Sequence, residues 1–118
     1  MGAARGTRVL EIGDVILCEE RRELRRGDAL VPVQPKVLDV LLYLVQNRHR
    51  VVSQPELLRG VWRDAVVTGA SLARALKEAR RALGDDGRGQ RWIRTLPGRG
   101  YRFVGPVTEK ADGAPAAI

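Results

Sequence analysis

The strongest constraint on the fold lies in residues 69–104, GASLARALKEARRALGDDGRGQRWIRTLPGRGYRFV, where a helical pattern leads through a glycine-rich turn into two strand-like segments. At 100° per residue, one apolar stripe contains Leu72, Leu76, Ala79 and Leu83, which predicts a helix that buries this face. Gly84 follows where a glycine in the left-handed conformation closes a helix. The segment therefore predicts a helix over 69–83 and a β-hairpin over 91–104, with its turn at residues 97–100.

This segment also holds almost all of the charge imbalance of the chain. It carries a net charge of +6, whereas the whole chain of 118 residues carries +7. The face opposite the apolar stripe bears Arg74, Lys77, Glu78 and Arg81, with Ala70 and Ser71 near the start of the helix. A basic face confined to one unit is typical of a surface that binds a polyanion. A solvated charged face is the alternative for the helix alone, and the basic hairpin favours the polyanion.

The preceding residues supply a scaffold. Residues 8–33 contain four short β-like segments separated by turn residues, with charges that nearly cancel, which predicts an antiparallel meander. An apolar i, i+1, i+4, i+5, i+8 repeat begins at Val37 and predicts a core helix over 35–47, with Pro35 in its first turn. Val51 and Val52 predict a minimal strand.

A second helix is predicted over 53–62, because Ser53 and Glu56 have the spacing of a capping box. Residues 63–68 then link it to the basic helix. A core helix, a second helix and a basic helix in this order predict a helix-turn-helix with an enlarged turn.

Composition excludes several classes of protein. A single cysteine excludes an internal disulfide framework, and Cys18 is interpreted as a small buried apolar residue in a protein of the reducing cytosol. No apolar run approaches the roughly 18 residues of a membrane span, and the start of the chain lacks the apolar segment of a signal peptide. We expect one domain over 8–107, a disordered segment over 1–7 and a flexible tail or linker over 108–118.

Catalysis finds little support. His49 is the only histidine, it lies in a loop between two arginines, and no nucleophile stands in a suggestive motif. Asp85–Asp86–Gly87 is too short and too poor in ligands for a calcium loop, so it is interpreted as a turn. We therefore expect no enzymatic activity, no metal and no cofactor.

Three runs point to a known family: VVSQPELLRGVW, VVTGASLARALKEARRALGDD and RWIRTLPGRGYRFVGPV. They resemble the DNA-binding effector domain of OmpR/PhoB-type winged-helix transcription regulators, closest to the ToxR/CadC-like branch, over roughly residues 8–107. The resemblance implies an α+β fold, a winged helix-turn-helix with an N-terminal four-stranded antiparallel sheet, three helices and a C-terminal β-hairpin wing. It also implies that the third helix lies in the major groove of double-stranded DNA and the wing in the minor groove.

The resemblance assigns a DNA contact to each of several positions. Trp62 matches an aromatic residue that contacts a phosphate from the end of the second helix, and Arg80 matches a residue that reaches the backbone. Thr95 and Tyr101 match wing residues that touch phosphates, and Arg99 lies at the wing tip. The groove-facing positions of the third helix are Ala70, Ser71, Arg74, Lys77, Glu78 and Arg81.

Side-chain chemistry divides these contacts. Arg74 and Arg81 suit guanine, Glu78 suits a cytosine amine, and Ser71 is either a phosphate donor or a first-turn residue. The Trp62 ring can lie in the core while its N–H reaches a phosphate, and Trp92 is interpreted as core or wing packing. Five to six phosphates give a salt slope of roughly −4.5 to −5.5; the residues counted are Arg74, Lys77, Arg80, Arg81, Arg94 and Arg99.

The resemblance also suggests partners. Family members often bind direct repeats as head-to-tail pairs, so we expect weak self-association and pairing on DNA, and the loop over 63–68 often contacts RNA polymerase. Members commonly carry a phosphorylatable receiver domain or a membrane span and sensor. We expect the chain to lie in the cytoplasm at the nucleoid, either as a complete small regulator or as the cytoplasmic part of a larger, membrane-anchored or receiver-controlled one. The alternative function is a winged-helix module that binds protein or RNA through the same basic face.

Overall fold

The computed structural model describes residues 7–63, 68–86 and 88–112. The chain forms two compact units, residues 1–32 with 106–118 and residues 33–105. Helices and antiparallel strands are both present, and the predicted α+β architecture with three helices and a β-hairpin is confirmed. None of the described helices has the length and apolar character needed to cross a bilayer.

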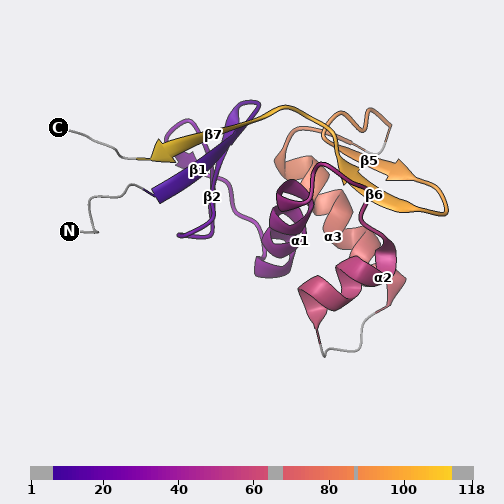
Figure 1. Cartoon of the computed structure of the whole chain (residues 1–118). Coiled ribbons are helices and arrows are strands. Elements are labelled where there is room, and N and C mark those ends of the chain that lie inside the picture. The colour runs from indigo at the N-terminus through magenta and orange to yellow at the C-terminus, as the bar shows by residue number, and fades with distance from the viewer. Residues whose placement is uncertain (1–6, 64–67, 87, 113–118) are drawn as a thin grey trace. The chain divides into compact units, whose positions relative to one another are not determined.

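The first unit is an antiparallel sheet (Figure 1). Its five strands stand in the order β4-β3-β2-β1-β7. They are β1 (Thr7–Ile12), β2 (Val15–Cys18), β3 (Glu23–Arg26), β4 (Ala29–Leu30) and β7 (Val107–Asp112). The predicted four-stranded meander is therefore present, with one additional strand from the C-terminal side of the chain.

Strand β7 corrects the prediction of a flexible tail over 108–118. Its six residues pair with β1 in an antiparallel register from Ile12↔Val107 to Thr7↔Asp112. The side chains of Thr108, Glu109 and Lys110 are exposed and polar, so this segment has no apolar alternation that would predict a strand. An edge strand needs only backbone hydrogen bonds and few apolar contacts, and the Lys110 Nζ also lies 3.0 Å from a Glu11 carboxylate oxygen. Thr7, which the expected disordered segment over 1–7 included, is the first residue of β1 and pairs with Asp112. Residues 1–6 and 113–118 lie outside the described residues.

One face of this sheet is strongly apolar. Period-2 alternation and the strand register place five side chains on the same face, and each is at most 3% exposed; they are Leu10, Ile12, Val15, Leu17 and Leu24. Cys18 is also buried, in line with its interpretation as an apolar residue.

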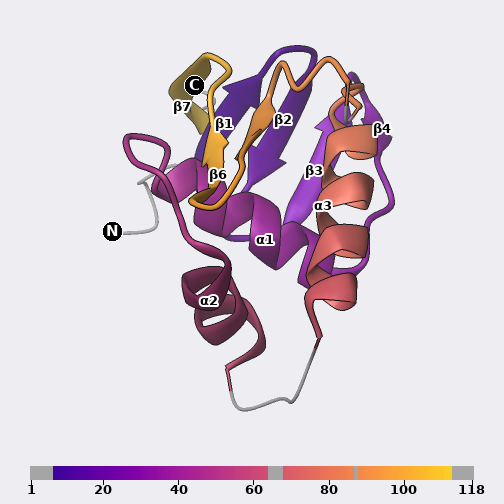
Figure 2. The same ribbon diagram turned by 90° about the vertical axis from the view of Figure 1, so that its right-hand side faces the viewer.

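The second unit is built around α1 (Pro35–Gln46), which lies within the predicted range 35–47. Seven apolar residues of α1 are buried, including Val40 and Leu44 outside the predicted stripe. The buried face is wider than the predicted stripe, which is typical of a core helix, while Lys36 and Gln46 on the other side are exposed. Helix α1 contacts α3, and Figure 2 shows the two helices beside each other.

The second helix is α2 (Gln54–Leu57), which continues directly as the π-helical turn η2 (Leu58–Trp62). The Ser53 Oγ accepts the Glu56 backbone N–H, as the capping box predicts. The reciprocal half of the box is diverted, because the Glu56 carboxylate accepts hydrogen bonds from Arg50 and Tyr43 instead. Arg50 and then Tyr43 hold the pKa of Glu56 at about 2.

The basic helix is α3 (Gly69–Ala82), with Leu83 as its C-cap. Gly84 has φ +75°, so the predicted glycine closure is confirmed. Its N–H donates to the Arg81 carbonyl while the Asp85 N–H donates to the Arg80 carbonyl, which is the Schellman arrangement. This closure fixes the direction in which the chain leaves the helix towards the hairpin.

The wing consists of β5 (Ile93–Leu96) and β6 (Gly100–Phe103). The Arg99 N–H donates to the Leu96 carbonyl across the turn, and Gly98 takes φ +76° after Pro97, which is the residue signature of a type II turn. The predicted minimal strand is present as a bridge between Val52 and the β6 residue Tyr101. The wing is thus tied to the segment that joins α1 to α2.

Candidate nucleic-acid interface

The outward face of α3 carries the predicted groove residues. Ser71, Arg74, Lys77 and Arg81 are exposed, Glu78 is half-buried, and Leu72, Leu76 and Ala79 on the other side are at most 2% exposed. Among the residues that the structure describes, no carboxylate pairs with Arg74, Lys77 or Arg81. The helix therefore presents three uncompensated cations on one side.

Arg80 has a different environment from its neighbours on α3. Its Nη2 donates to the Thr95 Oγ1 at 2.7 Å and its Nε donates to the Ile93 carbonyl at 3.2 Å. Both acceptors are neutral, so neither compensates the positive charge of the guanidinium at the junction between α3 and β5. A helix wheel places Arg80 beside the basic face, but only the folded structure places it against the wing.

The bond from Arg80 fixes the polarity of the Thr95 hydroxyl. A hydroxyl has one hydrogen to donate, and the Thr95 oxygen already accepts from a charged donor. The Thr95 hydrogen therefore points away from Arg80 and is available to another acceptor. Tyr101 lies directly across the hairpin from Thr95, so the two predicted phosphate contacts stand on the same face of the wing.

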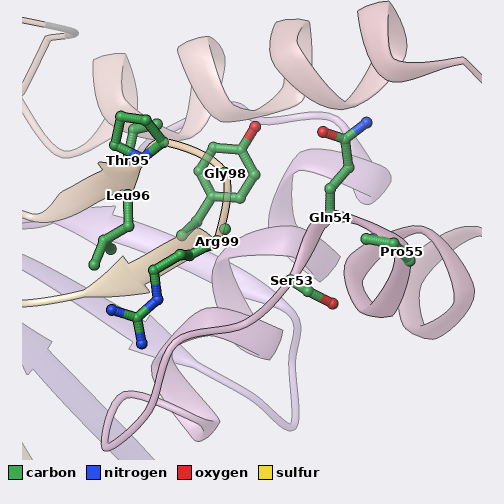
Figure 3. Close-up of a pocket in the computed structure, with 10 residues that line it drawn as sticks. Ser53, Gln54, Pro55, Thr95, Leu96, Gly98 and Arg99 are labelled. Carbon is green, nitrogen blue, oxygen red and sulfur yellow. The ribbon is translucent and has the colours of Figure 1, made fainter.

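Thr95 and Tyr101 line a hollow of about 300 Å³ between the wing and the start of α2. Ser53, Gln54 and Pro55 form its other wall. Figure 3 shows the Gln54 amide directed towards α3, and the Gln54 Nε2 lies 3.0 Å from the place that a Cβ at Gly69 would occupy. Gln54 was not among the predicted site residues, because a polar residue in the first turn of a helix gives no indication of its neighbours across the fold.

Close backbone contact positions the wing against this hollow. Val52 and Tyr101 exchange two backbone hydrogen bonds of 2.8 Å each. A Cβ at Gly100, where φ is +142°, would lie 2.1 Å from the Val52 carbonyl oxygen. Only glycine fits this position without a shift of the backbone.

The base of the wing is fixed by Asp85 and Trp92. An Asp85 carboxylate oxygen accepts a hydrogen bond from the backbone N–H of Trp92 at 2.8 Å. Burial alone would raise the pKa of Asp85, but backbone N–H donors led by Trp92 outweigh burial and the pKa falls below its ordinary value. The Trp92 ring lies 5.9 Å from the Phe103 ring, centroid to centroid, which confirms its interpretation as wing packing. The Asp85–Asp86 turn is therefore a structural element.

Trp62 ends η2 and is half-buried. The Lys36 Nζ donates to the Val61 carbonyl at 2.9 Å, so a cation from α1 satisfies one of the free carbonyls at this helix end. Arg63 follows with φ +54°. The predicted RNA polymerase loop over 63–68 lies outside the described residues at 64–67.

The remaining predicted contacts are on the wing. Arg94 on β5 and Arg99 at the tip are both exposed, and no carboxylate of the described residues pairs with either. Figure 3 shows the Arg99 guanidinium directed away from α3. The structure therefore brings Thr95, the partner of Arg80, into the hollow, while the Arg99 guanidinium lies on the side away from α3.

Comparison with known proteins gives these surfaces a context. Residues 27–103 match the model of the family described as transcriptional regulatory protein, C terminal. The transcriptional activator CadC of Escherichia coli is 28% identical over 100 residues, which are 84% of this chain and 20% of CadC. The transcriptional regulator HilA of Salmonella typhi is 40% identical over 92 residues, which are 78% of this chain and 16% of HilA.

Solved structures agree with the sequence matches. The DNA-binding domain of Escherichia coli CadC superposes with a TM-score of 0.73 at 26% identity, covering 87% of this chain and 97% of that domain. The Klebsiella pneumoniae RstA DNA-binding domain, solved in complex with the RstA box, has a TM-score of 0.70 at 21% identity, with 81% and 96% covered, and shows the same fold. The chain spans a fifth or less of the length of the CadC and HilA regulators. It belongs to the family of C-terminal domains of transcriptional regulatory proteins.

Proposed function

We propose that residues 7–112 are the sequence-specific, double-stranded DNA-binding effector domain of a bacterial transcription regulator, with α3 in the major groove and the wing in the minor groove. The observation that carries this proposal is the set of exposed cations without carboxylate partners among the described residues of α3 and the wing; they are Arg74, Lys77, Arg81, Arg94 and Arg99. A protein surface that leaves so many cations uncompensated suits a row of phosphates.

The inner face of the wing is the proposed phosphate site. The Thr95 hydrogen, which the bond from Arg80 leaves free, donates to a phosphate oxygen. Tyr101 lines the same hollow as Thr95, so its hydroxyl contacts the same backbone segment, and Arg80 adds its positive charge. Trp62 approaches the next backbone segment from the end of η2 through its indole N–H.

Base reading falls to the exposed half of α3. Arg74 and Arg81 present guanidinium forks that fit guanine O6 and N7, and Glu78 accepts from a cytosine amine. Lys77 adds a phosphate or base contact, and Ser71 donates near the start of the helix, where N-terminal residues of a recognition helix meet the bases.

The chain spans a small share of its relatives, so assembly and control are part of the proposal. Two copies pair on direct repeats of DNA and associate weakly without it. The loop over 63–68 contacts RNA polymerase. The domain acts in the cytoplasm on the nucleoid, either alone or as the cytoplasmic part of a membrane-anchored or receiver-controlled regulator.

Fluorescence anisotropy with a short random-sequence duplex across a salt series tests this function. We expect a log–log slope near −5 for the wild type, made shallower by about 0.9 in Arg74→Ala and in Arg99→Ala. Arg88→Ala, in the turn after α3, is the matched control and should keep the wild-type slope. A wild-type slope near zero, or equal competition by an A-form RNA duplex, would favour the protein- or RNA-binding module instead.

A further inference from the structure

The outer face of the wing carries an unusual cross-strand pair. Arg94 on β5 and Arg102 on β6 lie directly opposite each other in the register, and both are exposed. Among the cross-strand pairs of the described strands, this one alone joins two side chains of like charge. Such a pair destabilises a hairpin unless an anion lies between the two charges. We call Arg94 and Arg102 the outer wing pair.

No part of the described chain supplies that anion. No carboxylate of the described residues pairs with Arg94 or Arg102. The Arg102 Nε donates to the Arg48 carbonyl at 3.1 Å, which holds the side chain in place without neutralising it. One member of the outer wing pair is therefore positioned in advance, and both retain their charge.

Alternation along the strands sets the direction of the outer wing pair. Thr95 and Tyr101 lie on the inner face, where Thr95 meets Arg80 of α3, so Arg94 and Arg102 lie on the opposite face. The pair lies two residues back from the last rung of the hairpin, Leu96↔Gly100. Figure 3 shows that the Arg99 guanidinium at the tip is also directed away from α3. Three arginines thus extend towards the side of the wing that α3 does not occupy.

A hairpin tip in the minor groove has one sugar-phosphate backbone on each side. The inner face meets the backbone between α3 and the wing, which is the proposed Thr95–Tyr101 site. The outer face then meets the other backbone. We propose that Arg94 and Arg102 bind phosphates of this far strand, so that the wing grips both walls of the minor groove. This inference rests on the proposed function and extends its footprint to Arg102 and to a second strand.

DNA phosphate is a better occupant for this face than an acidic protein segment. The pair continues from the arginine-tipped turn, and a single strand of DNA offers phosphates at a regular spacing along which both guanidinium groups can find an acceptor. The Arg48 carbonyl holds Arg102 before binding, which lowers the entropy lost when the contact forms.

The first test is the salt slope on the random-sequence duplex. Arg94→Gln and Arg102→Gln should each make the slope shallower by about 0.9, and the double variant by about 1.8. Arg88→Gln is the control, because it removes the same charge from an exposed position in the turn before the wing. Arg102→Lys should restore most of the slope, because it retains the charge even though it loses the Nε that donates to the Arg48 carbonyl.

The second test locates the strand. A duplex selected from a random library by the wild-type chain is synthesised with neutral methylphosphonates on one or the other wall of the minor groove. The wild type should lose affinity for substitutions on both walls, and the double variant only for those on the wall nearer α3. Circular dichroism melting of each variant checks folding, and Arg94→Gln tests the pair even if Arg102→Gln weakens the Arg48 contact.

The outcomes separate this inference from the function on which it rests. A wild-type salt slope near zero would contradict both the proposed function and the inference about the outer wing pair. A wild-type slope near −5 that the double variant leaves unchanged overturns the inference alone, as does equal sensitivity of wild type and double variant to far-wall methylphosphonates. A loss of slope equal to that of Arg88→Gln also overturns it, because the effect is then one of net charge.

Discussion

The bond between Arg80 and Thr95 should couple the recognition helix energetically to the wing. Thr95→Val keeps the shape of the side chain and removes the oxygen that accepts from the Arg80 Nη2 at 2.7 Å. Arg80→Met keeps most of the apolar stem and also removes the bond to the Ile93 carbonyl. A hydrogen bond from a charged donor contributes about 1.5 to 3 kcal/mol when buried, and partial exposure here reduces the expected coupling to about 1 kcal/mol.

A double-mutant cycle measures this coupling. Urea unfolding should give losses of about 1 kcal/mol for Thr95→Val and about 2 kcal/mol for Arg80→Met, and the double variant should be less destabilised than the sum by about 1 kcal/mol. On the random-sequence duplex, Arg80→Met should make the salt slope shallower by about 0.9, whereas Thr95→Val should weaken binding without a change of slope, because the threonine hydroxyl carries no charge.

Additive losses would refute the coupling, since two groups that do not interact contribute independently. A shallower slope in Thr95→Val would also contradict the reasoning, because it would mean that loss of the hydroxyl moves a charged group off DNA. Lys77→Met is the control for the cycle: its side chain is exposed on α3, and it should show no coupling to Thr95→Val.

Three further perturbations follow from the structure. Gly100→Ala places a Cβ 2.1 Å from the Val52 carbonyl oxygen and should lower the free energy of unfolding by about 3 kcal/mol, whereas Gly98→Ala meets open space and should cost about 1 kcal/mol for its positive φ; equal losses in urea would contradict the close contact. Glu56 has a folded pKa of about 2 against an ordinary 4.5, so its stabilising contribution is complete above about pH 4.5 and is lost as the pH falls towards 2. Glu56→Gln should remove about 1 kcal/mol at neutral pH, after allowance for solvent screening, and should flatten this acid limb, and an unchanged limb would exclude Glu56 as its source. Truncation after Pro106 removes β7 and should destabilise the sheet, while truncation after Asp112 keeps every β1–β7 pair and should melt as the full chain does.

Local patterns predicted the elements whose causes are local. The stripe through Leu72 and Leu76 placed α3, and Gly84 marked its end, because helix period and left-handed closure depend on neighbouring residues. The hydrogen-bond partners of the Glu56 carboxylate could not be predicted from local patterns. A capping box depends on four consecutive residues, and nothing in those four shows that Arg50 and Tyr43 compete for the same carboxylate.

In the candidate site, too, features set by neighbouring residues were predicted and contacts between distant residues were not. The helix period predicted that Arg74, Lys77 and Arg81 are exposed on one face of the site, as the structure shows. The pairing of Arg80 with Thr95 joins residues from different elements, and the opposition of Arg94 and Arg102 depends on the register of a hairpin whose turn length had to be known. Strand β7 depends on the free edge of β1, which lies far away in sequence.

Three contacts on different sides hold the wing in position before any DNA arrives. Arg80 ties the inner face of β5 to α3, the two backbone bonds between Val52 and Tyr101 tie the edge of β6 to the connector before α2, and Arg102 ties the outer face to Arg48. If the hairpin were mobile before binding, each side chain fixed on DNA would cost conformational entropy. A wing already held on three sides loses less entropy, so more of the contact energy contributes to the binding free energy. A wing so held also fixes the distance between its tip and α3. The two elements can then meet adjacent grooves only at one spacing, and shape thereby adds to the sequence preference that α3 supplies.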